Sequence, residues 1–111
     1  MSMPSHEEET LQQRIIEQVF THARSIPAGR VIAYGALGAR CTPPISGYIC
    51  GRIMNQTLDD VPWWRVVAKD GSLPIAKRNP ALAQEQRDKL VAEGVTFDEE
   101  GRIHMSQFSL Y

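Results

Sequence analysis

The residues best suited to bind a ligand are Trp63 and Trp64, which stand side by side between Pro62 and Arg65. Proline disfavours a helix at this point and a pair of valines follows, so the segment is typical of a loop-to-strand junction. Two large indoles at such a junction either fill a small core or line a binding site. A nucleic acid base would suit them, because every base has a flat face that stacks on an aromatic ring. The residue types leave both interpretations open.

Nucleophiles and metal ligands are few and scattered. Cys41 and Cys50 form no C-x-x-C motif, and His6, His22 and His104 are far apart. This pattern predicts reduced thiols, no metal site and no cofactor. The reduced thiols, together with an acidic, polar N-terminus that is unlike a secretory signal, favour a cytoplasmic location.

The chain of 111 residues is expected to form one domain, residues 1–111, with a modest core. Its apolar runs fall short of the ~20 residues that span a bilayer, so no membrane partner is expected. The net charge is −1, but residues 27–78 carry seven basic and three acidic side chains, and both flanking regions are negative. A basic centre suits a protein that touches phosphates with one face, in weak and salt-sensitive binding.

An amphipathic helix is expected over residues 5–26. Ser5 and Glu8 fit a capping box at its start, and Pro27 follows its end. Its apolar residues recur at helical spacing and predict a buried stripe: Leu11, Ile15, Val19, Ala23 and Ile26.

Two shorter helices joined by a tight turn are expected next. The first covers Tyr34 to Arg40, although Ala33 offers no capping side chain at its start. The second follows a turn at residues 41–44, with Thr42 as its cap, and runs to about Gln56.

Gly47 and Gly51 lie four residues apart, on one face of the second of these helices. Each glycine weakens a helix interior by roughly 1 kcal/mol relative to alanine, so close approach of that face to another surface is expected. Helix, turn and helix over residues 34–56 outline a helix-turn-helix.

A small β-hairpin is expected after the tryptophans. Val66-Val67 and Leu73-Pro74-Ile75 flank a turn that contains Asp70-Gly71. The loop that follows carries Lys77 and Arg78.

A last helix is expected over residues 81–93, closed by Gly94, with residues 84–89 directed outward. The residues expected inward are Leu82, Leu90 and Val91. The tail, residues 95–111, alternates apolar residues and is expected to pack back on the domain.

Several of these segments together resemble one family. They are the block IPAGRVIAYGALGARCTPP, the glycine and methionine of GYICGRIM, the segment VPWWRVV, and LVAEGV near the end. They resemble the alkyltransferase-like proteins, which are non-enzymatic relatives of the O6-alkylguanine-DNA alkyltransferases. The resemblance spans about residues 11–97. Its most specific element is the alkyltransferase motif Pro-Cys-His-Arg-Val, which here is Pro62 to Val66.

The resemblance implies a mainly α, winged-helix-like DNA-binding domain whose helix-turn-helix enters the minor groove, where a damaged guanine is rotated into a pocket. Trp63 occupies the nucleophile position and Trp64 the histidine position. An indole neither attacks an alkyl carbon nor takes a proton, since its nitrogen is only a donor, so the usual alkyl transfer is not expected.

The resemblance also matches Tyr34 to the tyrosine that turns the phosphate of the rotated nucleotide, although a tyrosine at a helix start also fits simple core packing. Tyr48 stands where relatives carry the arginine that fills the stack. A tyrosine ring could wedge there, but it cannot supply the charge of that arginine. Arg52, one turn further on, is a substitute from a different direction.

These observations favour a non-enzymatic sensor that binds duplex DNA containing O6-alkylguanine, as a monomer, and marks it for another pathway such as nucleotide excision repair. The alternatives are a DNA-binding or protein-interaction module without lesion flipping, and an unconventional alkyltransferase that uses Cys41 or Cys50. The residues expected to contact DNA or the lesion are Tyr34, Gly47, Tyr48, Gly51, Arg52, Trp63, Trp64, Arg65, Lys77 and Arg78.

Overall fold

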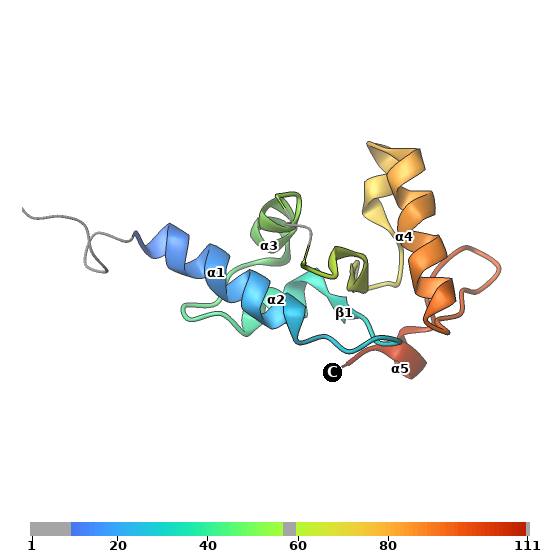
Figure 1. The fold of residues 1–111 in the computed structure, drawn as a ribbon, viewed down its shortest axis with the longest axis horizontal. Helices are drawn as coiled ribbons and strands as arrows, with labels where there is room; N and C mark the ends of the chain where they lie inside the picture. The colour runs from blue at the N-terminus through green and yellow to red at the C-terminus, as the bar shows by residue number, and fades with distance from the viewer. Residues whose placement is uncertain (1–9, 57–59, 111) are drawn as a thin grey trace, which may run out of the picture.

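The computed structural model describes residues 10–56 and 60–110, and this part of the chain is mainly helical (Figure 1). Its elements, in order, are α1 (Leu11–Arg24), β1 (Ile32–Ala33), α2 (Tyr34–Ala39), α3 (Gly47–Met54), the 3-10 turn η2 (Trp63–Arg65), β2 (Val66–Val67), the 3-10 turn η3 (Pro74–Lys77), α4 (Pro80–Ala92) and α5 (Met105–Phe108). No helix within these ranges is long and apolar enough to cross a membrane.

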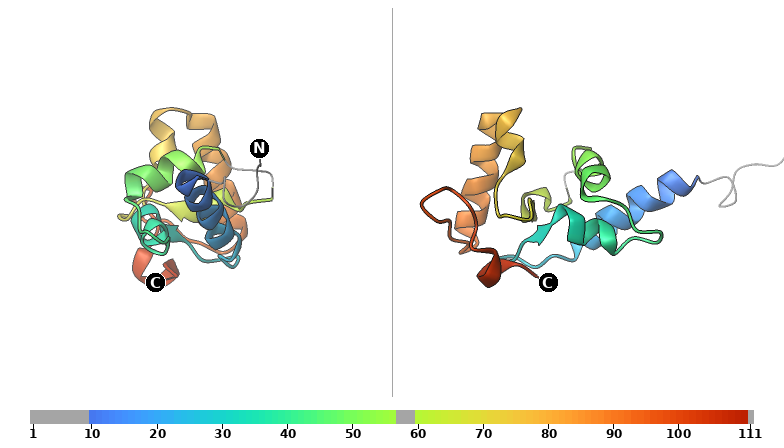
Figure 2. Two further views of the ribbon diagram at one scale, coloured as in Figure 1. Left: turned by 90° about the vertical axis from the view of Figure 1, so that its left-hand side faces the viewer. Right: turned by 180° about the vertical axis from the view of Figure 1, so that it is seen from behind.

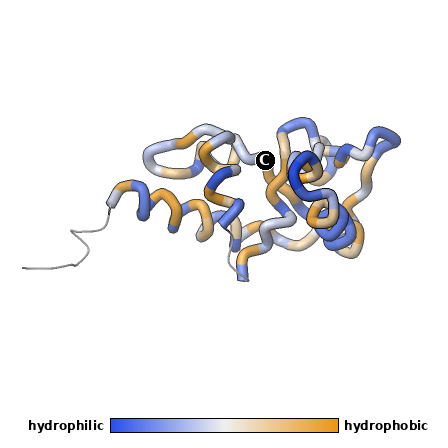
Figure 3. The backbone as a smooth tube through the Cα atoms, turned by 90° about the horizontal axis from the view of Figure 1, so that it is seen from above, coloured by the Kyte–Doolittle hydropathy of each residue, from blue (hydrophilic) through white to orange (hydrophobic). Residues whose placement is uncertain are grey.

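α1 is an amphipathic helix with a reciprocal cap. The hydroxyl of Thr10 accepts from the backbone N–H of Gln13, whose side chain accepts in turn from the backbone N–H of Thr10. The predicted cap, Ser5 with Glu8, lies outside the described residues, and the helix begins at Leu11. Hydrophobic residues recur along α1 in Figure 3, and its second half buries the predicted stripe, although the side chain of Leu11 is exposed.

The predicted helix-turn-helix is present, with a shorter second helix. α2 matches the expectation and has no side-chain cap at Ala33. α3 begins at Gly47 and is capped by Ser46, so the prediction of Thr42 as the cap is wrong. The reason is a backbone turn: the carbonyl of Gly38 accepts from the N–H groups of Cys41 and Ile45, which keeps residues 41–45 against α2.

Close contact between the helices explains one of the two spaced glycines. A Cβ at Gly47 would lie 3.1 Å from the backbone nitrogen of Gly35 in α2, so the predicted close approach is confirmed there. A Cβ at Gly51 would lie 3.8 Å from the ring of Tyr34, which is ordinary van der Waals contact.

We expect Gly38→Ala to lower the free energy of unfolding by about 1–3 kcal/mol, as overpacking does. The added Cβ would lie 2.5 Å from the carbonyl oxygen of Ile45. Gly51→Ala is the matched control, because it removes a glycine from a helix interior without a clash and is expected to be neutral or stabilising. Urea unfolding of both variants tests this, and equal stabilities would contradict the tight α2–α3 turn.

The small sheet is parallel, so the predicted hairpin is wrong. β1 pairs with β2 in the register Ile32 with Val66 and Ala33 with Val67. The predicted turn exists, since the N–H of Ala68 donates to the carbonyl of Ser72 over 3.1 Å. The chain then enters η3 at Pro74, which has no N–H to give to a strand partner.

Two hydrophobic clusters lie on the two sides of this sheet. Cluster 1 joins α1, α2 and α3 with Val61 and Val66, and cluster 2 joins α4 and the tail with Val31 and Val67. The tail packs back as predicted: Val31 donates to the carbonyl of Phe108 over 3.0 Å, and Leu110 donates to that of Val31 over 2.7 Å. In the right-hand view of Figure 2, α1 and α4 lie toward opposite ends of the molecule, and α3 lies between them.

Candidate nucleic-acid interface

The two tryptophans lie in η2, immediately before β2, which confirms the predicted junction. Their rings are perpendicular, at 87° with centroids 6.1 Å apart. Trp63 packs against cluster 1 and Trp64 against cluster 2, so the pair straddles the two halves of the domain. Both indoles are half-buried.

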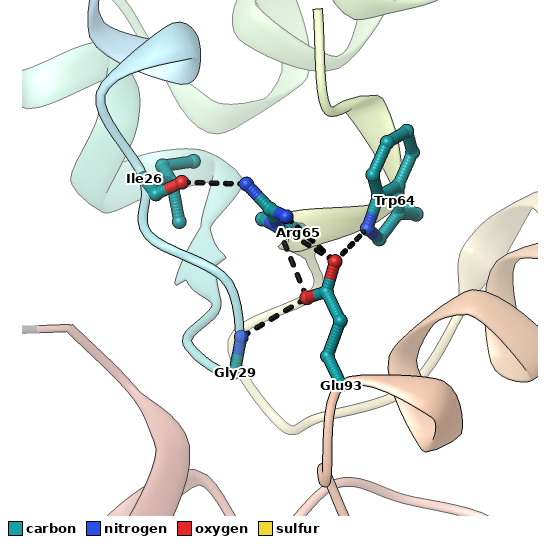
Figure 4. Close-up of polar contacts among 5 residues, drawn as sticks. All are labelled: Ile26, Gly29, Trp64, Arg65 and Glu93. Carbon is teal, nitrogen blue, oxygen red and sulfur yellow. Dashed lines mark hydrogen bonds and ion pairs between the residues drawn. The ribbon is translucent and has the colours of Figure 1, made fainter.

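The carboxylate of Glu93, at the end of α4, fixes this turn (Figure 4). It accepts from Nε1 of Trp64 at 2.8 Å, from Nη2 of Arg65 at 2.6 Å and from the backbone N–H of Gly29 at 3.0 Å. Arg65 also donates to the carbonyl of Ile26 at 2.8 Å. We call η2, which carries the two tryptophans, the aromatic turn. The ion pair between Glu93 and Arg65, with its hydrogen bonds to Gly29 and Ile26, therefore joins α4, the aromatic turn and the segment that follows α1.

This environment holds Glu93 ionised. Burial alone would raise its pKa, but the hydrogen bonds from Arg65, Gly29 and Trp64 outweigh burial, so the pKa of Glu93 lies below its ordinary value. The side chain of Glu93 is 14% exposed and that of Arg65 is 15% exposed, which leaves little contact with solvent.

Gln86 adds a second attachment from α4. Its side-chain amide donates to the carbonyls of Trp64 at 3.2 Å and Val66 at 3.3 Å. The prediction that residues 84–89 face outward is therefore wrong for Gln86, which is 2% exposed, and Val91, predicted inward, is 53% exposed. α4 is rotated to bring Ala83, Gln86 and Leu90 inward, because the buried amide satisfies two backbone carbonyls.

Trp64 and Arg65 both make contacts within the domain, through their hydrogen bonds to Glu93. The guanidinium of Arg65 lies 5.2 Å from the centroid of the Trp64 ring, and Nζ of Lys89 lies 4.8 Å from it. Both distances suit cation–π attraction. Trp64 and Arg65 therefore hold the turn in place.

A groove of about 660 Å³ opens between α3 and η3. The phenol of Tyr34 lines it, α3 forms one wall with Tyr48, Gly51 and Arg52, and Arg78 lies on the other. α3 and the η3–α4 unit rise on the same side of the molecule in Figures 1 and 2. The full lining is Tyr34, Gly47, Tyr48, Gly51, Arg52, Asn55, Gln56, Pro74, Ile75 and Arg78.

The groove gathers six of the ten predicted site residues: Tyr34, Gly47, Tyr48, Gly51, Arg52 and Arg78. Trp63, Trp64, Arg65 and Lys77 do not line it. Trp63 and Tyr34 nevertheless pack against the same cluster. Lys77 is exposed at the end of η3, next to Arg78.

Tyr34 stays protonated in this groove. Burial raises the pKa of its phenol above the ordinary value, Cys50 adds to the rise and Arg78 opposes it. The hydroxyl therefore remains a hydrogen-bond donor at neutral pH. Nearby, Arg78 donates to the side-chain carbonyl of Asn55 at 2.9 Å, which links η3 to the end of α3 across the groove.

Tyr48 is the most exposed of the large apolar side chains in the described ranges, at 73%. The guanidinium of Arg52 lies 6.0 Å from its ring centroid, one helical turn further on. A ring and a cation thus stand together on the outer surface of α3.

Neither cysteine belongs to the groove lining. Cys50 is fully buried and Cys41 is 3% exposed. Burial raises the pKa of both thiols, to about 12 for Cys50. Among the described residues, no group of three or more His, Cys, Asp or Glu side chains could hold a metal ion.

We expect both thiols of the folded protein to resist alkylation at pH 8, since the thiolate is the reactive form. Urea should expose them and make both react at the rate of ordinary free thiols. Counting modified cysteines by mass spectrometry, with and without urea, checks this, and rapid modification of the native protein would contradict burial.

Comparison of the sequence with models of known protein families identifies the family of this domain. Residues 14–95 match the model of a family described as the 6-O-methylguanine DNA methyltransferase, DNA binding domain. The chain belongs to this methyltransferase DNA-binding domain family. The match begins at Arg14 within α1, includes α2 to α4 and ends at Val95, so the groove and the turn that carries Trp63 and Trp64 both lie in the family domain.

Two curated bacterial proteins are similar to this chain over most of its length. A DNA base-flipping protein of Vibrio parahaemolyticus is 26% identical over 97 residues, which cover 86% of this chain and 94% of that protein. A DNA base-flipping protein of Escherichia coli is 27% identical over 108 residues, which cover 96% of this chain and 81% of that protein.

A solved structure of the same fold contains DNA. S. pombe Atl1, in complex with damaged DNA containing O6-carboxymethylguanine, is similar with a TM-score of 0.73 and 25% identity over 98% of this chain and 99% of that chain. The predicted alkyltransferase-like fold with its helix-turn-helix is confirmed, apart from the hairpin.

Proposed function

We propose that this chain is a non-enzymatic DNA-binding protein that recognises O6-alkylguanine in duplex DNA and rotates the lesion out of the stack. The groove beside α3 carries the proposal, because it gathers an aromatic floor and two cations at the helix-turn-helix. The base-flipping relatives and the Atl1 complex with damaged DNA support it.

The chemistry of the groove suits a nucleotide. Arg52 and Arg78 attract phosphates, and no acidic side chain from residues 10–56 or 60–110 lines the groove. The protonated hydroxyl of Tyr34 donates to the phosphate of the rotated nucleotide. α3 enters the minor groove, and Tyr48 fills the gap that the base leaves, as wedge side chains do.

The chain binds without alkyl transfer. By its resemblance to the alkyltransferase motif, Trp63 stands at the nucleophile position and Trp64 at the histidine position, and an indole serves neither role. The two thiols are buried and do not line the groove. Because the lesion stays in the DNA, the chain acts as a monomeric marker for another repair pathway, such as nucleotide excision repair.

Titration of two fluorescent duplexes, one with a central O6-methylguanine and one with guanine, tests the proposal at low salt. We expect tighter binding of the damaged duplex, with both affinities falling as salt rises. Equal affinities would overturn lesion recognition and leave a DNA-binding module. Undetectable binding of both would overturn the DNA interface itself.

A further inference from the structure

The width of α3 sets a requirement on any complex in which it enters the minor groove. An α-helix with its side chains is about 10–12 Å across, whereas the minor groove of B-DNA is about 6 Å wide. The helix must therefore widen the groove and contact both of its walls. The groove lined by Tyr34 contacts one DNA strand, so the opposite side of α3 must contact the second DNA strand.

That side of α3 carries a second groove. It lies between α3 and the N-terminal half of α1, with a volume of about 440 Å³. Arg52 on α3 and Gln56 just beyond its end line both grooves, so the two grooves adjoin at these side chains. Ile49 and Ile53 face the second groove, and at 100° per residue they lie on a different side of the helix from Tyr48 and Gly51.

The lining of the second groove fits a sugar-phosphate strand. Isoleucines and a leucine supply apolar contact for deoxyribose carbons, and Ile49 and Leu11 are 41% and 55% exposed. Gln12, Gln56 and Arg52 supply donors for phosphate oxygens, and among the described residues no side chain of the lining is acidic. Three of the four exposed large apolar side chains in the described ranges, Leu11, Tyr48 and Ile49, line one groove or the other.

We propose that the groove between α1 and α3 seats the strand complementary to the lesion. The strand that carries the lesion lies along the groove lined by Tyr34, so the two DNA strands contact opposite sides of α3. This inference rests on the proposed function, because it requires α3 to enter the minor groove. It assigns α1 a role in DNA binding that is separate from recognition of the damaged base.

Hydroxyl-radical footprinting on each strand, together with the duplex titration, tests the proposal with Ile49→Ser. The side chain is exposed, so the fold should be retained, and Leu11→Ser provides a second, independent variant. Val91→Ser is the matched control, since Val91 is exposed on α4 and lines neither groove.

We expect Ile49→Ser to weaken binding of damaged and normal duplexes by the same factor, roughly three- to tenfold for loss of a partly buried side chain. Protection of the complementary strand from hydroxyl radicals should be weaker than with the wild type. The ratio of the affinities for the damaged and the normal duplex should be unchanged. Val91→Ser should behave as the wild type.

Wild-type affinity and full protection in both the Ile49→Ser and Leu11→Ser variants would overturn the assignment. A wild-type footprint confined to the lesion strand would also overturn it, while leaving lesion recognition intact. A wild-type chain that protects neither strand would overturn both proposals.

Discussion

Replacement of Trp63 by alanine is expected to reduce the preference for damaged over normal duplex while background binding persists. Trp63 is half-buried against the cluster that also supports Tyr34, and it stands at the position that faces the alkyl group in the family resemblance. Base–aromatic contact contributes about 1–3 kcal/mol, so the loss of discrimination should be roughly five- to 150-fold.

Parallel titration of damaged and normal duplexes measures this loss. Trp63→Phe is the matched control, because it keeps an aromatic face and should keep most of the preference. Thermal unfolding of both variants separates a loss of packing from a loss of contact. An unchanged affinity ratio in a folded Trp63→Ala variant would mean that the indole does not touch the lesion.

Glu93→Ala is expected to have the largest effect on stability. The substitution leaves Arg65 without its ion partner and frees Trp64 and Gly29. Removing one member of a buried pair lowers the free energy of unfolding by about 3–5 kcal/mol, and the residual exposure of this pair places it near the lower figure. Urea unfolding measures the change.

Glu85→Ala is the control, because Glu85 is exposed on the same helix and its replacement should leave the stability nearly unchanged. Equal losses of stability in the two variants would mean that the contacts of Glu93 with Trp64, Arg65 and Gly29 do not stabilise the fold.

The same contacts predict a dependence of stability on pH. The pKa of Glu93 is lower in the folded protein than its ordinary value, so its contribution is complete above that ordinary value. The contribution is lost as the pH falls through the folded pKa. Urea unfolding from pH 7 down to about pH 3 should therefore show a smaller decline in Glu93→Ala than in the wild type. Parallel declines would contradict an ionised Glu93.

Hydrophobic periodicity and helix-terminating residues predicted most of the helices. The predicted N-terminal caps did not contribute, because Ser5 lies outside the described residues and Ser46, not Thr42, caps α3. The apolar spacing of α1 and the stop at Pro27 are local signals, and Tyr34 to Arg40 was correctly predicted as a short helix. Register against distant partners is not local. Ile32 pairs with Val66 across more than thirty residues, and no turn between neighbouring segments indicates such a parallel pair.

The site was predicted better where it follows one helix than where it depends on tertiary contacts. Gly47, Tyr48, Gly51 and Arg52 lie on α3, so helical spacing brings them together. Glu93 was missed, although a carboxylate at the C-terminus of a helix is disfavoured by the helix dipole and therefore indicates a cationic partner.

The distribution of charge along the sequence predicted only some of the cations that line the groove. The basic centre of the sequence includes Arg65, but Glu93 of the acidic C-terminal region neutralises it inside the domain. Arg24, which precedes the basic centre, pairs with Asp60 of the centre at 3.0 Å. Arg52 and Arg78 are the cations left to line the groove, so DNA binding is expected to be sensitive to salt.

The central claim is recognition of O6-alkylguanine without chemistry, and one experiment tests it most directly. The protein is incubated with a duplex that carries labelled O6-methylguanine, the complex is isolated, and the label is located in protein and DNA after denaturation. We predict that the protein retains the damaged duplex over an unlabelled normal competitor and that all label remains on the DNA. Label on the protein, or no retention of the damaged duplex, would contradict this account.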